Sequence, residues 1–299
     1  MNNFHTPVLL KEVIELLQVN PGEKFIDTTI GGGGHTKEIL SRGGIVLGID
    51  LDQEALDYVE KNFKFQISNF KLTLARGNFK DLDEIARLKN FTKVKGILFD
   101  LGVSSHQIDT PQRGFSFLRE GPLDMRMDKN SSVTAEALVN LLQKGELYEL
   151  FSKLGEKRRA FAISKGIISA RRIKAIKTTE SLARVVEKAY GIRKHKASDF
   201  TKNLVNQKVF QALRIAVNDE LENIKKAMPK ALNLLERKGK IAVISFHSLE
   251  DGIVKKAFKE FEEKNMGKII TKKPVIATEE EIRQNKRARS AKLRVFERS

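Results

Sequence analysis

The sequence predicts an α/β protein, with an open, mostly parallel sheet interrupted by a helical insertion. Apolar strand-like runs alternate with helix-like stretches up to residue 100 and again after residue 200. That alternation builds a parallel sheet with helices on both faces. The run DTTIGGGGHT at 27–36 lies between a strand-like and a helix-like stretch. Glycine is unfavourable inside either element, so the run predicts a sharp turn or a close approach to a ligand, as at the nucleotide-binding corner of such a sheet.

Each element of the first half follows from local patterning. Short apolar runs flanked by polar residues predict strands, and the longer mixed stretches between them predict helices. Strands are expected at Phe25–Ile30, Ile45–Ile49, Leu72–Ala75 and Gly96–Phe99, and helices at about Lys37–Ser41, Gln53–Phe63 and Asp81–Leu88.

The alternation stops between residues 108 and 200, where no convincing strand-like run occurs. Helices are expected there at Ala135–Leu142, Leu147–Leu154, Ala160–Ala170 and Glu180–Tyr190. The prediction is therefore one domain formed by residues 1–107 and 201–299, with 108–200 as an all-helical insertion.

The last third of the chain returns to the first pattern. Apolar residues at steps of four predict the buried stripe of one long helix, formed by Val209, Leu213, Val217 and Leu221 with Phe210 and Ile224 alongside. A strand at Lys240–Phe246 and a helix at Leu249–Phe261 should follow. Ile269–Thr271 and Leu293–Phe296 are candidates for a terminal hairpin.

Composition excludes several classes of protein. The 299 residues are 40% hydrophobic, with no apolar run near the roughly 18 residues of a membrane span. The polar start MNNFHTP lacks the basic and apolar regions of a signal peptide. Without cysteine, disulfides and thiolate metal sites are excluded. We expect a cytoplasmic protein with no membrane partner and no metal.

The net charge of +17 is unevenly distributed. Lys153 to Lys177 contains nine basic residues and one acid, and Arg283 to Arg298 contains seven and one. Such clusters suggest a polyanionic partner, because each phosphate contact releases counterions. The alternatives are that the whole proteome is basic or that these residues form a solvated charged face. Composition alone gives a nucleic-acid partner roughly even odds against them.

The glycine block leaves the cofactor ambiguous. In the dinucleotide pattern G-x-G-x-x-G, Gly31 and Gly33 fit but the third position is Thr36, so NAD and S-adenosylmethionine (SAM) both stay open. Asp50 ends the strand IVLGID, where a carboxylate can accept both ribose hydroxyls of a nucleoside. Its alternative role, an acid at a helix N-terminus, can fall to Asp52.

Further candidates follow the third and fourth strands. Phe79 could cover an adenine face, although phenylalanine is more often core. Asp100 leaves the fourth strand where open sheets bind ligands and could face the positive end of one. The next residues offer neutral hydrogen bonds, from Ser104, Ser105 and Gln107. The alternative is a loop whose polar side chains bond their own backbone.

Two later segments carry weaker signals. Phe115 and Phe117 could stack on a base, although packing is favoured, and Arg126 could hold a phosphate. His247 in ISFHSLED is a candidate polar group at the cleft, while Ser248 and Asp251 have the spacing of a capping box. No Ser-His-Asp or metal-ligand spacing supports hydrolysis or zinc chemistry.

Together these segments resemble one family over residues 5–298. DTTIGGGGH, GID, DLGVSSHQID, RGFSF, GPLDMRM, FQALRIAVNDEL, ISFHSLED and RARSAKLRV are similar to the bacterial 16S ribosomal RNA cytosine-N4 methyltransferases. The resemblance implies a Rossmann-like class I SAM-dependent methyltransferase sheet, with the insertion recognising substrate. It implies SAM contacts at Gly33, Gly34, His35, Asp50, Phe79, Asp100 and Gln107, of which His35 is nominated by the resemblance alone.

The reaction implied is transfer of a methyl group from SAM to N4 of a cytidine in the decoding region (P site) of 16S ribosomal RNA, cytidine 1402 in the usual rRNA numbering. The small ribosomal subunit would be the partner. The chain departs from the family at Leu204–Lys208, at Gly252 and at Lys286, which affects RNA and loop contacts but not the cofactor site.

No catalytic residue is assigned. The Asn/Asp-Pro-Pro-aromatic loop of DNA N-methyltransferases is absent after the fourth strand, so Ser104, Ser105 and Asp124 are the candidate acceptors near N4. Alternatives are a SAM-dependent N-methyltransferase of another nucleic acid, DNA included, or of a protein or small molecule, and a non-catalytic SAM-binding ribosome-assembly factor. An NAD-dependent oxidoreductase is disfavoured by the absent third glycine. Monomer and dimer both stay open.

Overall fold

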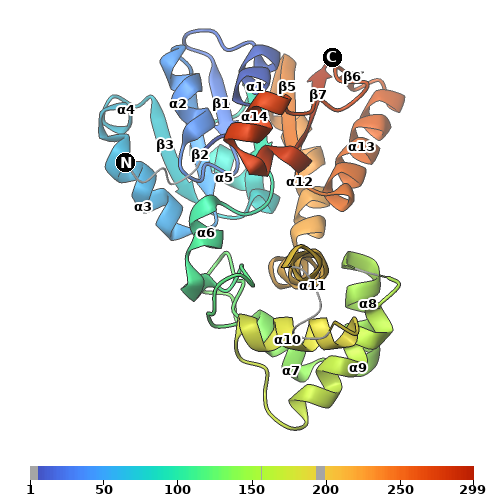
Figure 1. Cartoon of the computed structure of the whole chain (residues 1–299). Coiled ribbons are helices and arrows are strands. Elements are labelled where there is room, and N and C mark those ends of the chain that lie inside the picture. The colour runs from blue at the N-terminus through green and yellow to red at the C-terminus, as the bar shows by residue number, and fades with distance from the viewer. Residues whose placement is uncertain (1–5, 156, 193–198) are drawn as a thin grey trace. The chain divides into compact units, whose positions relative to one another are not determined.

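The computed structural model of the chain describes residues 6–155, 157–192 and 199–299. The chain divides into two compact units, one formed by Met1–Ser104 with Leu221–Ser299 and the other by Ser105–Glu220 (Figure 1). The first unit contains the sheet and the second is helical. The sequence predicted that the insertion ends at residue 200. In the structure the helical unit extends further, because α11 (Asp199–Asn218) belongs to it.

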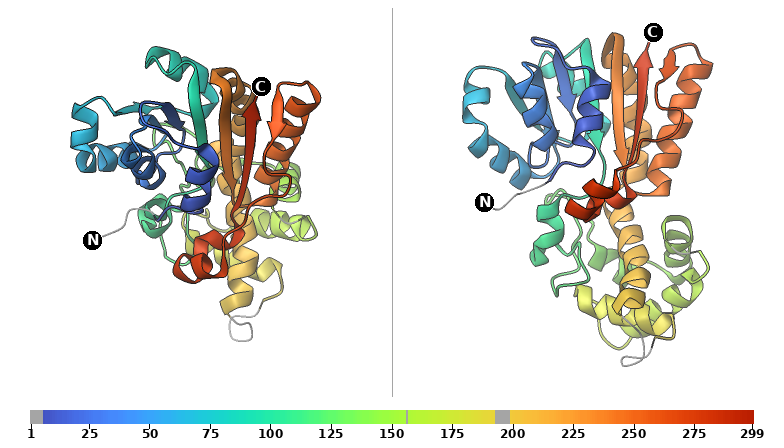
Figure 2. Two further views of the ribbon diagram at one scale, coloured as in Figure 1. Left: turned by 90° about the horizontal axis from the view of Figure 1, so that it is seen from above. Right: turned by 45° about the horizontal axis from the view of Figure 1, so that its top comes forward.

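Within the described residues, seven strands form one sheet in the order β3-β2-β1-β4-β5-β7-β6. The strands are β1 (Lys24–Asp27), β2 (Ile45–Asp50), β3 (Leu72–Arg76), β4 (Val94–Asp100), β5 (Leu235–Ser245), β6 (Gly267–Ile269) and β7 (Lys292–Arg298). β1 to β5 are parallel, and β7 runs antiparallel to both β5 and β6 (Figure 2). The α/β sheet predicted from the alternation is confirmed, with the order of a Rossmann-like class I methyltransferase sheet.

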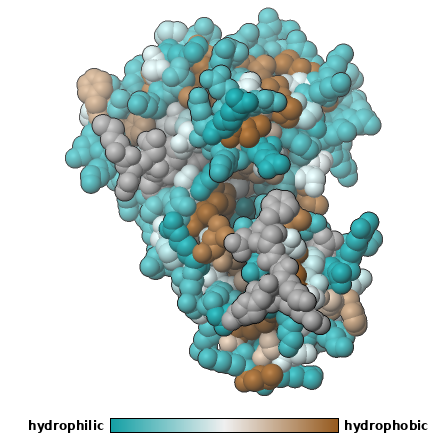
Figure 3. Space-filling view, viewed as in Figure 1, coloured by the Kyte–Doolittle hydropathy of each residue, from teal (hydrophilic) through white to brown (hydrophobic). Residues whose placement is uncertain are grey.

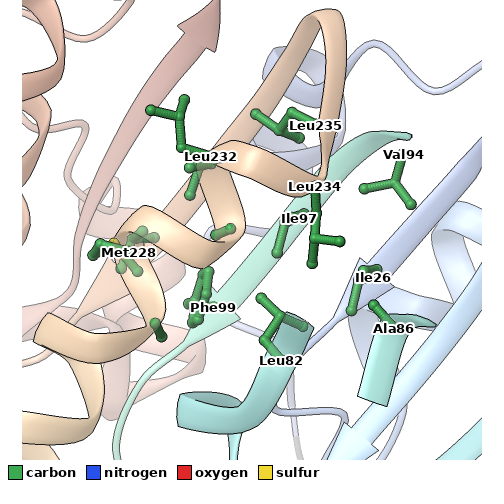
Figure 4. Close-up of a cluster of buried hydrophobic side chains, with 14 of the residues drawn as sticks. Ile26, Leu82, Ala86, Val94, Ile97, Phe99, Met228, Leu232, Leu234 and Leu235 are labelled. Carbon is green, nitrogen blue, oxygen red and sulfur yellow. The ribbon is translucent and has the colours of Figure 1, made fainter. Parts of the chain in front are cut away.

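The strands are apolar on both faces because helices cover both. Ile26, Ile97 and Phe99 belong to one core with α5 (Leu82–Leu88), α12 (Glu220–Leu234) and α13 (Ser248–Glu263), part of which Figure 4 shows. Their strand neighbours Phe25 and Leu98 belong to a second core with α1 (Leu10–Leu17), α2 (Gly34–Ser41) and α3 (Gln53–Asn62). This alternation, with no exposed face, is the pattern of a parallel sheet between two helical layers.

Three short helices of the sheet unit were not predicted. They are α1, α4 (Lys64–Ser68) and α14 (Glu279–Gln284). The short 3-10 turns η1 (Phe79–Asp81) and η3 (Lys286–Ser290) were not predicted either. The proposed terminal hairpin exists as the antiparallel pair β6 and β7, in which Ile269 lies opposite Phe296, but α14 and η3 separate the two strands in sequence.

The helical unit contains α6 (Ser105–Asp109), η2 (Pro111–Arg113), α7 (Ala135–Leu141), α8 (Lys144–Leu154), α9 (Ala160–Arg171), α10 (Thr179–Ala189) and α11. The four helices predicted for the insertion correspond to α7 to α10. Thr178 caps α10, and its side chain and that of Ser181 exchange hydrogen bonds with each other's backbone N–H. Arg171 donates to the carbonyls of Val139 and Leu142 and so joins α9 to the end of α7.

The single long helix predicted from Val209 to Leu221 is wrong. The chain leaves the right-handed helical region at Asp219, where φ is +51°, so α11 ends at Asn218 and α12 begins at Glu220. Asn218 fixes this end by donating to the carbonyl of Met125 and accepting the N–H of Met127. Leu221 is only half-buried, whereas Val209, Leu213 and Val217 are buried as predicted. The apolar residues keep their four-residue spacing across the break, so the spacing alone could not predict it.

In the part of the chain that the structure describes, no helix combines the length and the apolar character needed to cross a membrane.

Candidate cofactor-binding site

Two aspartates end neighbouring parts of the parallel sheet on its carboxyl edge. Asp50 ends β2 and Asp100 ends β4, with β1 between these two strands. Ligands of open α/β sheets bind outside the carboxyl ends of the strands, where the strand order reverses around β1 and β4. This edge is therefore the candidate site.

The Asp50 carboxylate is held by two backbone groups. Oδ2 accepts the N–H of Gly31 and Oδ1 accepts the N–H of Asp52, each at 2.9 Å. Each oxygen keeps a lone pair for a further donor. Burial raises the pKa of Asp50 to about 6, against the lowering effect of these two hydrogen bonds. Asp52 caps α3 with its own side chain, so the two acids divide their roles as the sequence indicated.

The glycine block forms the turn between β1 and α2. Gly31 and Gly33 have φ of +49° and +76°, a region that favours glycine. Cβ atoms built on Gly33 and Gly34 would lie 2.9 Å from the Phe63 ring and from Pro7. Both glycines are thus required by the protein's own packing, and their backbone is the part available to a ligand.

His35 lies in a buried polar cluster behind this turn. Its Nε2 lies 3.0 Å from the carbonyl oxygen of Val8, which assigns the proton to Nε2 because a carbonyl can only accept. Its Nδ1 lies 3.7 Å from Oδ2 of Asp100. Asp27 lies nearby, accepts the Thr36 hydroxyl at 2.7 Å, and has its pKa raised by burial. His35 therefore holds the turn through the carbonyl of Val8, and with an exposed fraction of 4% it offers little surface to a ligand.

Thr29 connects the ends of β1 and β4. Its hydroxyl accepts the N–H of Asp100 at 2.7 Å, and its own N–H donates to Asp27 at 3.3 Å. Sequence reasoning did not single out Asp27, Thr29 or Thr36. The signal was present in the polar letters DTT directly after a buried strand, but which strand they would meet depends on the sheet order.

Phe79 begins η1, separated from the end of β3 by two residues, and is half-buried. Its ring meets Phe99 edge-on, with the centroids 5.8 Å apart. This contact fixes one edge of the ring in the core. The packing alternative is thus observed, and the contact of the remaining ring surface with an adenine stays a prediction.

The remaining cofactor and acceptor candidates fall in the sequence where the chain passes from one unit to the other. Ser104 is the last residue of the sheet unit, while Ser105 and Gln107 belong to α6 of the helical unit. The Gln107 side chain is buried. Their roles toward a ligand stay predictions.

Asp124 and Arg126 are engaged with each other inside the helical unit. Asp124 accepts from Nε of Arg126 at 2.7 Å and from Nη2 at 2.8 Å, while Nη1 donates to the carbonyls of Lys129 and Ser131. Burial alone would raise the pKa of Asp124, but the hydrogen bonds and charge of Arg126 outweigh it and lower the pKa. In this structure Arg126 braces its own loop, and the phosphate contact expected of it stays a prediction.

His247 serves as the N-cap of α13. Its Nδ1 accepts the N–H of Glu250 at 3.4 Å, and Glu250 returns a carboxylate to the N–H groups of Phe246 and His247. The capping box predicted for Ser248 and Asp251 is thus wrong by one residue. Asp251 instead binds Arg294 of β7, at 2.6 Å from Nε. The two residues lie 43 positions apart in the sequence, so local patterns could not predict that Asp251 pairs with Arg294.

The aromatic residues of the insertion pack inside the protein, which is the alternative that the sequence favoured over stacking on a base. Phe115 is buried, and Phe117 meets Phe210 edge-on with centroids 5.3 Å apart.

The two basic runs, at 153–177 and 283–298, differ in how exposed their side chains are. Arg294 is buried against Asp251, and Arg298 donates to carbonyls at the end of α12, whereas the basic side chains of the insertion run are mostly exposed.

Comparison with known proteins agrees with this geometry. Residues 2–299 match the MraW methylase family. The chain belongs to this family. It is 44% identical, over 98% of each chain, to the ribosomal RNA small subunit methyltransferase H of Halothermothrix orenii, and 43% identical to the protein of the same name from Coprothermobacter proteolyticus, over 99% of this chain and 97% of that one.

Solved structures are more distant. An rRNA methylase from Streptococcus thermophilus is 11% identical, covering 98% of this chain and 97% of that one with a TM-score of 0.45, a likeness that adds nothing to the assignment.

Proposed function

We propose that the protein transfers the methyl group of SAM to the N4 amine of a cytidine in the decoding region of 16S ribosomal RNA. The observation that carries the proposal is the Asp50 carboxylate, held by Gly31 and Asp52 at the carboxyl edge of a methylase-family sheet with acceptor capacity left over. The names of the relatives, which specify the small-subunit RNA, support the substrate.

The residues at this edge suit SAM chemically. Asp50 would accept the ribose hydroxyls, and the backbone of the Gly33–His35 turn would face the amino-acid part. Asp100 would offer negative charge to the cationic part, and Phe79 an apolar face to the adenine. When bound, the cofactor supplies an electrophilic methyl group on a sulfonium. The protein therefore needs to position rather than to activate it.

The amine needs more help than the methyl group. The lone pair of cytidine N4 is delocalised into the ring, so an acceptor that holds an N4 hydrogen favours the pyramidal geometry required for attack. N4 would form a bond to the methyl carbon while the carbon–sulfur bond of the sulfonium breaks and leaves a neutral thioether, and N4 would then lose a proton. Ser104, Ser105 and Asp124 are the candidate acceptors, of which Asp124 already accepts from Arg126 on both oxygens. The cytidine must also be unstacked, at a cost of a few kcal/mol, which exposed basic side chains of the insertion would offset by binding flanking phosphates.

The decisive experiment measures modified nucleosides by mass spectrometry in 16S ribosomal RNA from cells with and without the protein. N4-methylated cytidine should disappear without it and return on complementation. Small subunits from the deficient cells should then accept label from methyl-labelled SAM in the presence of purified protein. An unchanged amount of N4-methylcytidine in the 16S ribosomal RNA of the deficient cells would contradict the proposal.

The same experiment separates the alternatives. Label on another nucleic acid but not on the small subunit would indicate a different N-methyltransferase. Retention of SAM without label transfer to any RNA would indicate an assembly factor. Cytoplasmic location follows from the proposed substrate.

A further inference from the structure

Helix α4 and the turn after it expose two aromatic rings. Phe65 and Phe70 have exposed fractions of 73% and 84%. Apolar atoms stand out over α4 at the edge of the sheet unit in Figure 3. Neither ring contributes to a core cluster, so neither is explained by folding.

The backbone makes the choice of phenylalanine at position 70 more unusual. The N–H of Phe70 donates to the carbonyl of Ile67 at 3.1 Å, and the N–H of Lys71 donates to that of Gln66 at 2.9 Å. These two bonds form the Schellman motif, whose left-handed residue is usually glycine. Phe70 has φ of +59°, a conformation rare for a bulky side chain. The chain thus keeps an exposed ring where glycine would be less strained.

The segment that carries these rings is basic, while the acids Asp57 and Glu60 lie on the neighbouring helix α3. From Lys61 to Lys80 the sequence has five basic residues and no acid, and Lys61, Lys64 and Lys71 are exposed. Basic side chains interleaved with exposed aromatic rings are the composition of surfaces that bind single-stranded nucleic acid.

A hollow of about 660 Å³ lies between α3 and α4, the helix that carries Phe65. It is lined by Asp57, Glu60, Lys61, Lys64, Ile67 and Ser68. The Ile67 side chain forms an apolar part of the lining of this hollow. The two acids on the α3 side suit the amino groups of base edges, and the lysines suit phosphates.

This surface is attached to the candidate cofactor site. Phe63, between α3 and α4, is buried, and its ring lies against Gly33, where an added Cβ would approach it to 2.9 Å. The glycine turn and α4 therefore share a packing contact within one unit.

We propose that Lys61, Lys64, Phe65, Phe70 and Lys71, here called the α4 surface, bind an unpaired stretch of RNA. The rings stack on bases and the lysines bind the phosphates between them. The choice of RNA over DNA rests on the proposed function, while the stacking surface itself does not depend on which base is methylated.

The test uses the full chain and a fluorescein-labelled dodecamer of uridine, with binding followed by anisotropy. Phe65→Ala and Phe70→Gly should each weaken binding about five-fold or more, the range found for loss of one base–aromatic stack. Both should leave the salt dependence unchanged. Lys61→Gln and Lys64→Gln should reduce the slope of log K against log salt by about 0.7 each. Leu88→Ala, which removes another exposed apolar side chain of the sheet unit, is the matched control and should change neither quantity.

Phe70→Gly also separates binding from folding, because glycine at the left-handed position should keep or raise the melting temperature. Irradiation of the same dodecamer carrying 4-thiouridine should cross-link to the peptide that contains residues 64–71. Unchanged affinity of both ring variants, or cross-links confined to other peptides, would overturn the proposal. So would ring variants that abolish a dimer in sedimentation velocity while binding RNA normally, since the surface would then join two copies of the chain.

These outcomes are independent of the methylation assay. If N4-methylcytidine persists without the protein but the ring variants lose affinity for RNA, the proposed function fails and the α4 surface stands. If the protein methylates N4 and the ring variants bind RNA normally, only the α4 surface is lost.

Discussion

Oδ2 of Asp50 accepts the backbone N–H of Gly31 at 2.9 Å and so ties the end of β2 to the glycine turn that follows β1. One carboxylate thereby shapes the loop and keeps acceptor capacity at the carboxyl edge of the sheet. We expect Asp50→Asn to weaken SAM binding at least about ten-fold, because the amide cannot accept two ribose hydroxyls and two N–H groups. Calorimetry measures this, with Asp57→Asn on the exposed face of α3 as control. Unaltered affinity would remove Asp50 from the site.

The raised pKa of Asp50, about 6, predicts a pH dependence for cofactor binding. Hydroxyl donors stabilise the carboxylate form, so binding should lower this pKa and release a proton at acid pH. Affinity should therefore be constant above about pH 6 and fall by up to about ten-fold per pH unit below it. A titration from pH 5 to 8 tests this, and an affinity independent of pH would contradict it.

The same shift has the opposite sign for stability. Because the folded-state pKa of Asp50 lies above its ordinary value, protonation favours the folded state. This contribution is complete below about pH 4 and lost as the pH rises through about 6. Asp50→Asn should thus gain melting temperature relative to the native protein between pH 4 and pH 7.5. Parallel changes in the two proteins across this range would rule the effect out.

The Asp124–Arg126 pair predicts a stability effect within the helical unit. Asp124→Ala leaves the half-buried guanidinium without its carboxylate and should cost about 1–3 kcal/mol of unfolding free energy. The loss should be smaller in the Asp124→Ala, Arg126→Ala double variant than the two single losses added together. SAM affinity should stay normal. Methyl transfer at the native rate by folded Asp124→Ala would also remove Asp124 from the acceptor candidates.

The two basic runs should behave differently toward RNA. Lys174 and Lys177 of the insertion run are exposed, so Lys174→Gln and Lys177→Gln should each lower the salt slope of RNA binding by about 0.7. Arg294 is buried and paired with the half-buried Asp251, so Arg294→Met should leave the slope unchanged and reduce stability by about 1–3 kcal/mol, since Asp251 keeps Lys292 as a partner. A changed slope for folded Arg294→Met would show that it contacts phosphate.

The cap of α13 predicts separate outcomes for two substitutions of His247. Ala cannot cap and should lower stability by about 1 kcal/mol, while Asn, a good N-cap residue, should restore it. If capping is the whole role of His247, the Asn variant should also methylate normally. Native stability with lost methyl transfer in the Asn variant would instead place His247 at the substrate.

Local patterns predicted those parts of the protein that depend on local physics. The apolar runs around Ile26, Leu47 and Ile97 predicted buried strands, because a parallel sheet covered on both faces needs apolar residues at every position. The glycine block predicted the turn, because Gly31 and Gly33 adopt positive φ. Even here the pattern was incomplete, since the periodicity through Val217 concealed the helix break at Asp219.

What the sequence by itself determined is the α/β order, the glycine turn with Asp50 beside it, and membership of a methylase family. The tertiary structure alone decided which side chains meet: Asp100 with Thr29 and His35, Asp251 with Arg294, and Asp124 with Arg126. Periodicity and turn propensity act over a few residues and can be read along the chain. The partner of a charge or a hydroxyl depends on strand order and on burial, which exist only once the sheet is assembled.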